Sequence, residues 1–178
     1  VCKPVLADIE TPVFIWKKLY SGEKYSFLLE SVSGQESIAR YSFLGGNPFM
    51  VFRVNGESWE ISGTKQETGT GKPIDALRKL LSAYKPAPVS GMPPFCGGAV
   101  GFFSYDSIRM WENIPDKNPK EDPLDDIFFA FYKDLIAFDN REHRILLISN
   151  IITEPGCNLK NAYNRALDKI EQMDLKIR

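Results

Sequence analysis

The strand-like segments of this sequence follow one another with little helix between them, and this order limits the folds available to the chain. Segments 49–54 and 58–62 are joined by an Asn-Gly pair at 55–56, which favours a tight β-hairpin turn because both turn residues need positive φ. Segments 127–138 and 144–151 are joined by a second polar turn. Strands joined by short turns pair antiparallel. We therefore expect an α+β fold built on a mostly antiparallel β-sheet.

About three helices are expected to flank this sheet. A Thr-Pro pair at 11–12 supplies an N-cap and a first helical residue for a helix over 13–19. Pro73 opens the second helix and Asn158 caps the third. Their apolar residues recur at helical spacing: Ile74, Leu77, Leu80, Leu81 and Tyr84, then Leu159, Tyr163, Ala166, Ile170 and Met173. The Gly- and Thr-rich stretch 63–71 is predicted to be an exposed loop.

The composition excludes several classes of protein. The 178 residues suit one domain, and 22 Lys and Arg against 23 Asp and Glu leave no basic excess for nucleic acid. No apolar run is long enough for a membrane helix, and no signal-peptide pattern begins the chain. One histidine and three widely spaced cysteines are typical of a cytoplasmic protein with reduced thiols, without a zinc site or disulfide framework.

Three local patterns favour structural roles over chemistry. The glycines of 97–101 depart from the phosphate-binding G-x-G-x-x-G spacing because residue 99 is alanine, so they indicate a bent or closely packed strand. The acidic residues of 121–126 alternate with prolines and lack the rhythm of a calcium loop, which predicts a solvated loop. His143 lies at a hairpin end and is expected to be exposed.

The best candidate for ligand binding is the segment Leu28-Leu29-Glu30-Ser31. An apolar strand that ends in a carboxylate and a hydroxyl suits an α-amino group and a polar ligand edge. The alternative is an ordinary strand end whose polar residues face a turn. Arg40 follows nearby and adds a cation that pairs either with Glu30 or with a ligand carboxylate.

Several motifs in their order resemble a known family, the anthranilate synthase component I family. The resemblance rests on Glu10-Thr11-Pro12-Val13, Phe27-Leu28-Leu29-Glu30-Ser31, Arg40-Tyr41-Ser42-Phe43-Leu44-Gly45 and Gly97-Gly98-Ala99-Val100-Gly101, followed by the paired strands up to Asn150. It covers the chain from about Pro4 to the last helix. Phe102-Phe103-Ser104 departs from the family, which more often has a tyrosine and a glycine there.

The resemblance implies a function for a longer protein. The family enzyme converts chorismate and ammonia to anthranilate and pyruvate in tryptophan biosynthesis, with Mg²⁺ as cofactor and a glutamine amidotransferase subunit as the ammonia source. Its chorismate and Mg²⁺ ligands lie in a C-terminal catalytic domain that is absent from residues 1–178. The present chain then corresponds to the N-terminal regulatory domain, whose strands form part of a β-sandwich, and no catalytic activity of its own is expected.

Within that regulatory domain the resemblance assigns feedback binding of L-tryptophan to the Leu-Leu-Glu-Ser segment. Ser31 is the foremost contact residue, Leu29 and Glu30 belong to the same segment, and Arg40 is a neighbour. Two alternatives remain open. One is the similar N-terminal domain of aminodeoxychorismate synthase component I, from the folate pathway. The other is a stand-alone amino-acid-binding module.

Overall fold

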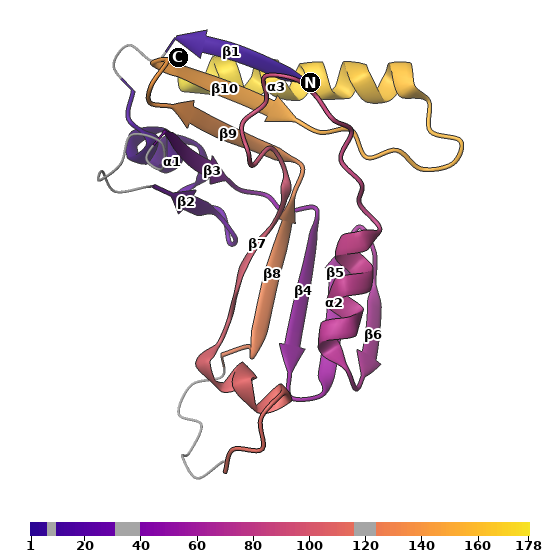
Figure 1. Cartoon of the computed structure of the whole chain (residues 1–178). Coiled ribbons are helices and arrows are strands. Elements are labelled where there is room, and N and C mark those ends of the chain that lie inside the picture. The colour runs from indigo at the N-terminus through magenta and orange to yellow at the C-terminus, as the bar shows by residue number, and fades with distance from the viewer. Residues whose placement is uncertain (7–9, 31–39, 116–123) are drawn as a thin grey trace. The chain divides into compact units, whose positions relative to one another are not determined.

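The structure of the chain is a computed structural model that describes residues 1–6, 10–30, 40–115 and 124–178. It divides into two compact units, each with a five-stranded sheet (Figure 1). Unit 1 comprises Val1–Pro48, Ser90–Gly98 and Tyr132–Arg178, whereas unit 2 comprises Phe49–Val89 and Ala99–Phe131. Both units combine a sheet with helix, so the predicted α+β class is confirmed.

The sheet of unit 1 has the strand order β1-β10-β9-β3-β2, and its neighbouring strands all pair antiparallel. Two helices, α1 and α3, belong to the same unit. The elements are β1 (Cys2–Leu6), α1 (Pro12–Tyr20), β2 (Phe27–Leu29), β3 (Tyr41–Gly45), β9 (Asp134–Asp139), β10 (Arg144–Ser149) and α3 (Leu159–Ile177). The predicted hairpin between the last two strands of the sequence is therefore present, as β9 and β10.

One face of this sheet packs against α1 and α3. Its core contains Ile15 from α1, Ile170 and Met173 from α3, and residues of three strands: Leu44, Ile136, Phe138, Ile145 and Leu147. Helix α1 begins as the sequence predicts, because the Thr11 hydroxyl accepts a hydrogen bond from the Phe14 amide at 3.2 Å. The N-terminal cap of α3 is formed in the same way by Asn158.

The opposite face of the sheet is covered by part of the segment that leads into strand β7 (Gly98–Phe103). Side chains of paired residues point to one face, so the register places Leu135, Ala137, Leu146 and Ile148 together on this side. These four residues are buried, and Phe43, Met92, Phe95 and Cys96 pack against them. Side chains of the segment 92–96 thus cover this face in place of a helix.

The sheet of unit 2 has the order β6-β5-β4-β8-β7, and α2 covers one of its faces. Its elements are β4 (Met50–Asn55), β5 (Ser58–Gly63), β6 (Glu67–Thr70), α2 (Pro73–Ser82), β7 (Gly98–Phe103), the 3₁₀ helix η1 (Tyr105–Met110) and β8 (Ile127–Tyr132). The core combines Leu77 and Leu80 of α2 with apolar strand residues: Met50, Phe52, Val54, Ile61, Ile127 and Phe131. The predicted hairpin is confirmed as β4 and β5, but its turn is displaced by one residue. Asn55 ends β4 opposite Ser58, so the turn residues are Gly56, at φ 60°, and Glu57, and Asn55 does not have the positive φ that the sequence predicted.

Two acidic residues of the predicted solvated loop support this hairpin instead. The Asp126 carboxylate accepts a hydrogen bond from the Gly56 amide at 2.6 Å. Asp125 accepts one from the Asn55 side chain at 2.9 Å and forms an ion pair with Arg53 at 3.5 Å. The other two acidic residues of this cluster, Glu121 and Asp122, lie outside the described residues.

Two predicted β-sheet assignments were wrong. The stretch 63–71 contains strand β6, which pairs with β5 and packs Gly69 under the ring of Trp59. The run 127–138 is two strands separated by Lys133, because β8 pairs with β4 in one sheet and β9 pairs with β3 and β10 in the other. The Lys133 carbonyl accepts hydrogen bonds from the backbone and side-chain nitrogens of Asn150, both at 2.9 Å.

The helices bury slightly different faces from those that the spacing predicts. In α2, Leu80 enters the core and Leu81 is exposed. In α3, Leu159 and Tyr163 are exposed, whereas Ala162 is buried. The other predicted core residues of these helices, Leu77, Leu80, Ala166, Ile170 and Met173, are buried, so the predicted face is correct over most of each helix.

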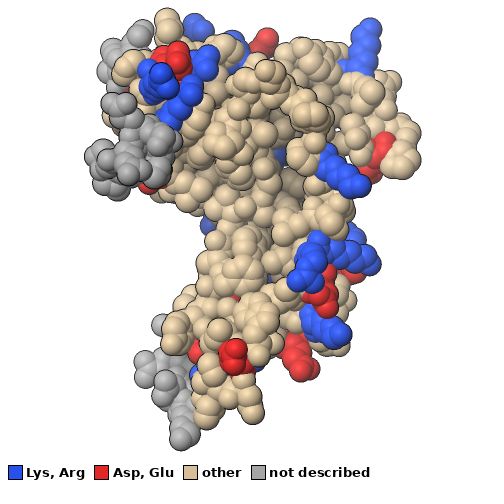
Figure 2. Space-filling view, in the orientation of Figure 1, with Lys and Arg blue, Asp and Glu red and all other residues tan. Residues whose placement is uncertain are grey.

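The surface carries charges of both signs and some apolar residues. On the face shown in Figure 2, Lys and Arg lie close to Asp and Glu, and much of the surface is uncharged. Several large hydrophobic side chains along β7 and η1 are exposed: Phe102, Phe103, Tyr105 and Ile108. Among the described helices, we find none with the length and apolar character needed to cross a bilayer. His143 is exposed, as expected.

Candidate functional site

The segment singled out by the sequence lies at the end of β2, an edge strand of the unit 1 sheet. Leu29, the last residue of β2, pairs with Phe43 of β3 and is 47% exposed. Glu30 follows it and is exposed. Ser31 lies outside the described residues, so the structure gives no position for this predicted contact. An exposed leucine beside an exposed carboxylate nevertheless combines an apolar and an anionic surface at one strand end.

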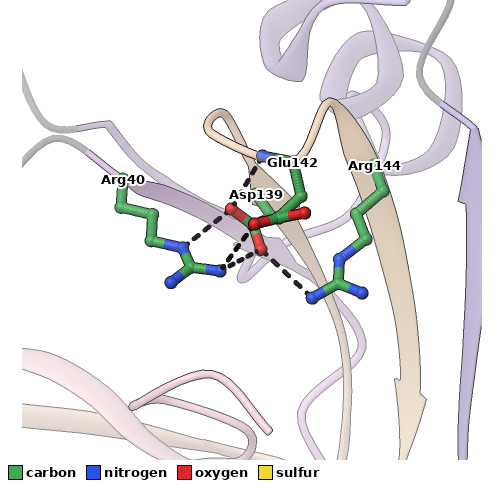
Figure 3. A network of polar contacts seen from close by, with 4 residues as sticks. All are labelled: Arg40, Asp139, Glu142 and Arg144. Atoms are coloured by element: carbon green, nitrogen blue, oxygen red, sulfur yellow. Dashed lines mark hydrogen bonds and ion pairs between the residues drawn. The ribbon is translucent and has the colours of Figure 1, made fainter. Parts of the chain in front are cut away.

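Arg40 lies just before β3, and its guanidinium is held by a carboxylate from a distant part of the chain. Its Nε donates to Asp139 Oδ1 at 2.9 Å and its Nη2 donates to Oδ2 at 2.7 Å (Figure 3). This two-point geometry matches the planar guanidinium to the planar carboxylate. The partner that the structure gives Arg40 is therefore Asp139, at the end of β9, and not Glu30.

Asp139 is the centre of a larger polar network at this end of the sheet. Its side chain is fully buried, and it also accepts hydrogen bonds from Arg144 Nη2 at 3.4 Å and from the Glu142 amide at 3.3 Å (Figure 3). The Glu142 carboxylate approaches Arg40 to 4.0 Å. Hydrogen bonds from Arg40 hold the pKa of Asp139 below its ordinary value, although burial acts in the opposite direction.

A row of aromatic rings continues from this network along the same face. The Arg40 guanidinium lies 4.9 Å from the centre of the Tyr41 ring, and Tyr41 stacks on Phe43 with 5.9 Å between ring centres. Phe95 meets the edge of Phe43 at 5.5 Å, and Phe27 meets Phe95 at 6.3 Å. The face beside Leu29 is therefore aromatic and preorganised by ring contacts.

The strand register places Glu30 and Arg40 at the same end of the β2–β3 pair. Since Leu29 lies opposite Phe43 in an antiparallel pair, Glu30, which follows Leu29, and Arg40, which precedes Tyr41, lie at the same end of these two strands. The site thus contains an apolar side chain, a carboxylate and an arginine fixed by Asp139, beside aromatic rings. This combination suits a small amphipathic ligand with a charged amino group. Among the described residues, no three His, Cys, Asp or Glu side chains are grouped so as to hold a metal ion.

Comparison with known proteins connects the whole chain to one group of sequences. No family model matches it. Anthranilate synthase component 1 from Acetivibrio thermocellus is 34% identical over 180 residues, covering 99% of the chain and 36% of that protein. The probable anthranilate synthase component 1 of Schizosaccharomyces pombe is 37% identical over 173 residues, covering 96% of the chain and 32% of that protein. This chain belongs to the anthranilate synthase component I family.

The similarity to this family extends over only part of its members. The chain spans about a third of the length of these anthranilate synthase relatives. The crystal structure of anthranilate synthase component I from Streptococcus pneumoniae superposes with a TM-score of 0.59 at 24% identity, covering 94% of this chain and 36% of that one. This superposition shows that the fold is shared.

The sequence predicts Arg40 as a residue of the candidate site but does not predict its partner Asp139. The motif that contains Arg40 is visible in the sequence, but its partner Asp139 is 99 residues away and looks like an ordinary turn residue. The available signal was the pair of flanking charges, Glu142 and Arg144, around a turn that follows an apolar strand. Polar turns of this composition are common at strand ends, and their residues mostly bond to the local backbone, so the pattern does not predict a long-range ion pair.

Proposed function

We propose that the chain is the N-terminal regulatory part of an anthranilate synthase component I, and that its segment 29–31 helps to bind L-tryptophan as a feedback inhibitor. The longer enzyme would make anthranilate and pyruvate from chorismate. A C-terminal domain would bind chorismate and Mg²⁺, and a glutamine amidotransferase subunit would supply ammonia. The proposal rests on sequence similarity. Nearly the whole chain is 34–37% identical to three anthranilate synthase component 1 proteins, and the match covers about a third of each of them.

The geometry at the end of β2 supports an amino-acid effector. Glu30 is an exposed carboxylate that can balance the ammonium group of tryptophan, and the exposed Leu29 side chain offers an apolar contact for its indole. Ser31 would donate or accept a hydrogen bond at the polar end of the ligand. Arg40 is already paired with Asp139, so its proposed role is to hold the end of β3 beside this segment.

Inhibition requires that tryptophan binds one state of the longer enzyme more tightly than another. If the state that it favours binds chorismate poorly, tryptophan lowers activity by shifting the population. The coupling is reciprocal, so saturating chorismate would weaken tryptophan binding by the same factor. The chain's contribution would be the part of the effector site that includes Glu30 and Ser31.

The proposal is tested with the longer enzyme and a tryptophan titration of anthranilate formation. Ser31→Phe should abolish inhibition by filling the site. Glu30→Gln should raise the half-inhibitory tryptophan concentration about tenfold, because it removes a charge-assisted contact and preserves the side-chain shape. Glu57→Gln is the matched control, since Glu57 is exposed in the β4–β5 turn and should leave inhibition unchanged.

Two results would reject parts of this proposal separately. Unchanged tryptophan inhibition in both site variants would remove the effector assignment and leave the enzyme assignment standing. Formation of 4-aminobenzoate precursors in place of anthranilate would identify the longer enzyme with the folate pathway instead.

A further inference from the structure

Two of the three cysteines lie on one face of the unit 1 sheet. Cys2 of β1 is directly opposite Ile148 of β10, and paired residues in an antiparallel ladder point to the same side. Ile148 belongs to the buried cluster against which Cys96 packs. Residues separated by more than ninety positions in the sequence therefore place two thiols around the same end of β10. All three cysteines are free in the structure.

The backbones that carry these two cysteines are both attached to the end of β10. Val1 and Ser149 exchange two hydrogen bonds, of 2.7 Å and 2.9 Å, which fix the residue before Cys2. The Cys96 carbonyl accepts a hydrogen bond from the Asn150 side chain at 2.5 Å. Consecutive residues of one segment thus position both thiols, and neither lies on a free loop.

The residue after Cys96 shows how closely this segment approaches β10. A Cβ atom on Gly97 would lie 2.5 Å from Asn150 Nδ2, and Gly97 has φ 155°. A side chain at this position would push the Cys96 backbone away from the sheet. The close approach keeps Cys96 over the face that also carries Cys2.

We propose that Cys2 and Cys96 form a disulfide when the protein meets an oxidising small-molecule disulfide such as oxidised glutathione. The thiolate of one cysteine attacks the small disulfide, forms a mixed disulfide and releases one small thiol. The second cysteine then attacks the protein sulfur of that mixed disulfide, which forms the Cys2–Cys96 bond and releases the second small thiol. Two protein thiols are oxidised and one small disulfide is reduced.

The bond would attach β1 to the segment 92–96 that covers the sheet. Under reducing conditions both residues remain thiols, so the crosslink would report oxidation rather than contribute to the resting fold. Burial raises the pKa of the Cys2 thiol, whereas the N-terminal amine and Arg144 act in the opposite direction. The smaller thiolate fraction of Cys2 makes its attack slow at neutral pH and faster at alkaline pH.

Peptide mapping distinguishes this pair from the alternatives. The reduced polypeptide is equilibrated with oxidised glutathione, alkylated and digested with trypsin without reduction. Because trypsin does not cleave before proline, Cys2 lies in peptide 1–17 and Cys96 in peptide 80–109, while Cys157 lies in peptide 145–160. The expected product is peptide 1–17 linked to peptide 80–109, with peptide 145–160 alkylated or bound to glutathione.

Variants and denaturant provide the controls. Cys2→Ser and Cys96→Ser should each remove the crosslink, whereas Cys157→Ser should preserve it. Oxidation in denaturant should remove the preference, because the native sheet no longer holds the two thiols together. The proposal would be overturned by native crosslinks that involve Cys157 equally, or by glutathione adducts on Cys2 and Cys96 without a bond between them.

Discussion

At the scale of single residues, Asp139 has the largest influence on the candidate site. It is buried at the end of β9, yet it keeps its charge because two arginines and a backbone amide donate to it. A buried carboxylate with such partners is stable only while the partners remain. The position of Arg40, next to the proposed effector segment, therefore depends on a residue that contacts no ligand in our proposal.

Replacing Asp139 by asparagine tests this dependence. The variant loses the charge of the acceptor and should unfold at lower denaturant concentration, with a free energy of unfolding lower by about 1–3 kcal/mol. Urea unfolding at neutral pH measures the difference. A stability equal to that of the parent protein would mean that solvent replaces the arginine contacts without cost.

The acid dependence of stability should change in the same variant. The pKa of Asp139 is lower in the folded chain than in the unfolded chain. Its stabilising contribution is thus complete above the unfolded value of about 4 and is lost as the pH falls through the folded value. Asp139→Asn should show a shallower loss of stability in this acid range. Parallel pH profiles for parent and variant would contradict the role of Asp139.

At the scale of elements, β7 lies so close to β8 that a glycine is needed at residue 101. A Cβ atom on Gly101 would overlap the Phe128 carbonyl oxygen of β8, so no side chain fits at this position without moving a strand. Gly101→Ala should separate β7 from β8 locally and increase amide hydrogen exchange in both strands. Gly22→Ala is the matched control, because a Cβ there meets no atom within 4 Å. Equal exchange in the two variants would show that the strands adjust.

The N-terminal cap of α1 offers a second test of an element. Thr11→Ala removes the acceptor for the Phe14 amide and should lower the free energy of unfolding by about 1 kcal/mol. For a chain of this size the melting temperature should fall by about 2–4 °C, as measured by circular dichroism. Thr11→Ser keeps the hydroxyl and should stay close to the parent. Similar losses in both variants would assign the effect to the missing methyl group.

Elements with local signals could be predicted from the sequence. The caps at Thr11 and Asn158 and the β4–β5 hairpin each follow from residues within a few positions of one another. Strand β6 gave no such signal, because an exposed edge strand needs little apolar alternation and is held by its ladder with β5. The sequence does not predict the break at Lys133, because the strands on both sides of it are largely apolar. The sheet that each strand joins is decided by strands far away in the sequence.

At the scale of the whole molecule, the chain corresponds to about a third of its anthranilate synthase relatives. Our proposal assigns chorismate and Mg²⁺ binding to the rest of such a protein. The chain alone, supplied with chorismate, ammonium and Mg²⁺, should therefore form no anthranilate above the uncatalysed rate. The fluorescence of anthranilate measures this directly. Measurable turnover by the chain alone would overturn the regulatory assignment.

The division into two units has a consequence for how the chain folds as it is synthesised. The polypeptide crosses from one unit to the other after residues 48, 89, 98 and 131. Strand β1 is synthesised before the other described strands, but its partner β10 is made only after all of unit 2. The hairpins of unit 2 connect near neighbours and should form during translation, whereas the first sheet waits for its last strands. In the interval β2 can pair with β3 and α1 can pack on them, but β1 has no strand partner and β3 lacks β9, so apolar surface of this sheet stays exposed until the last strands are made.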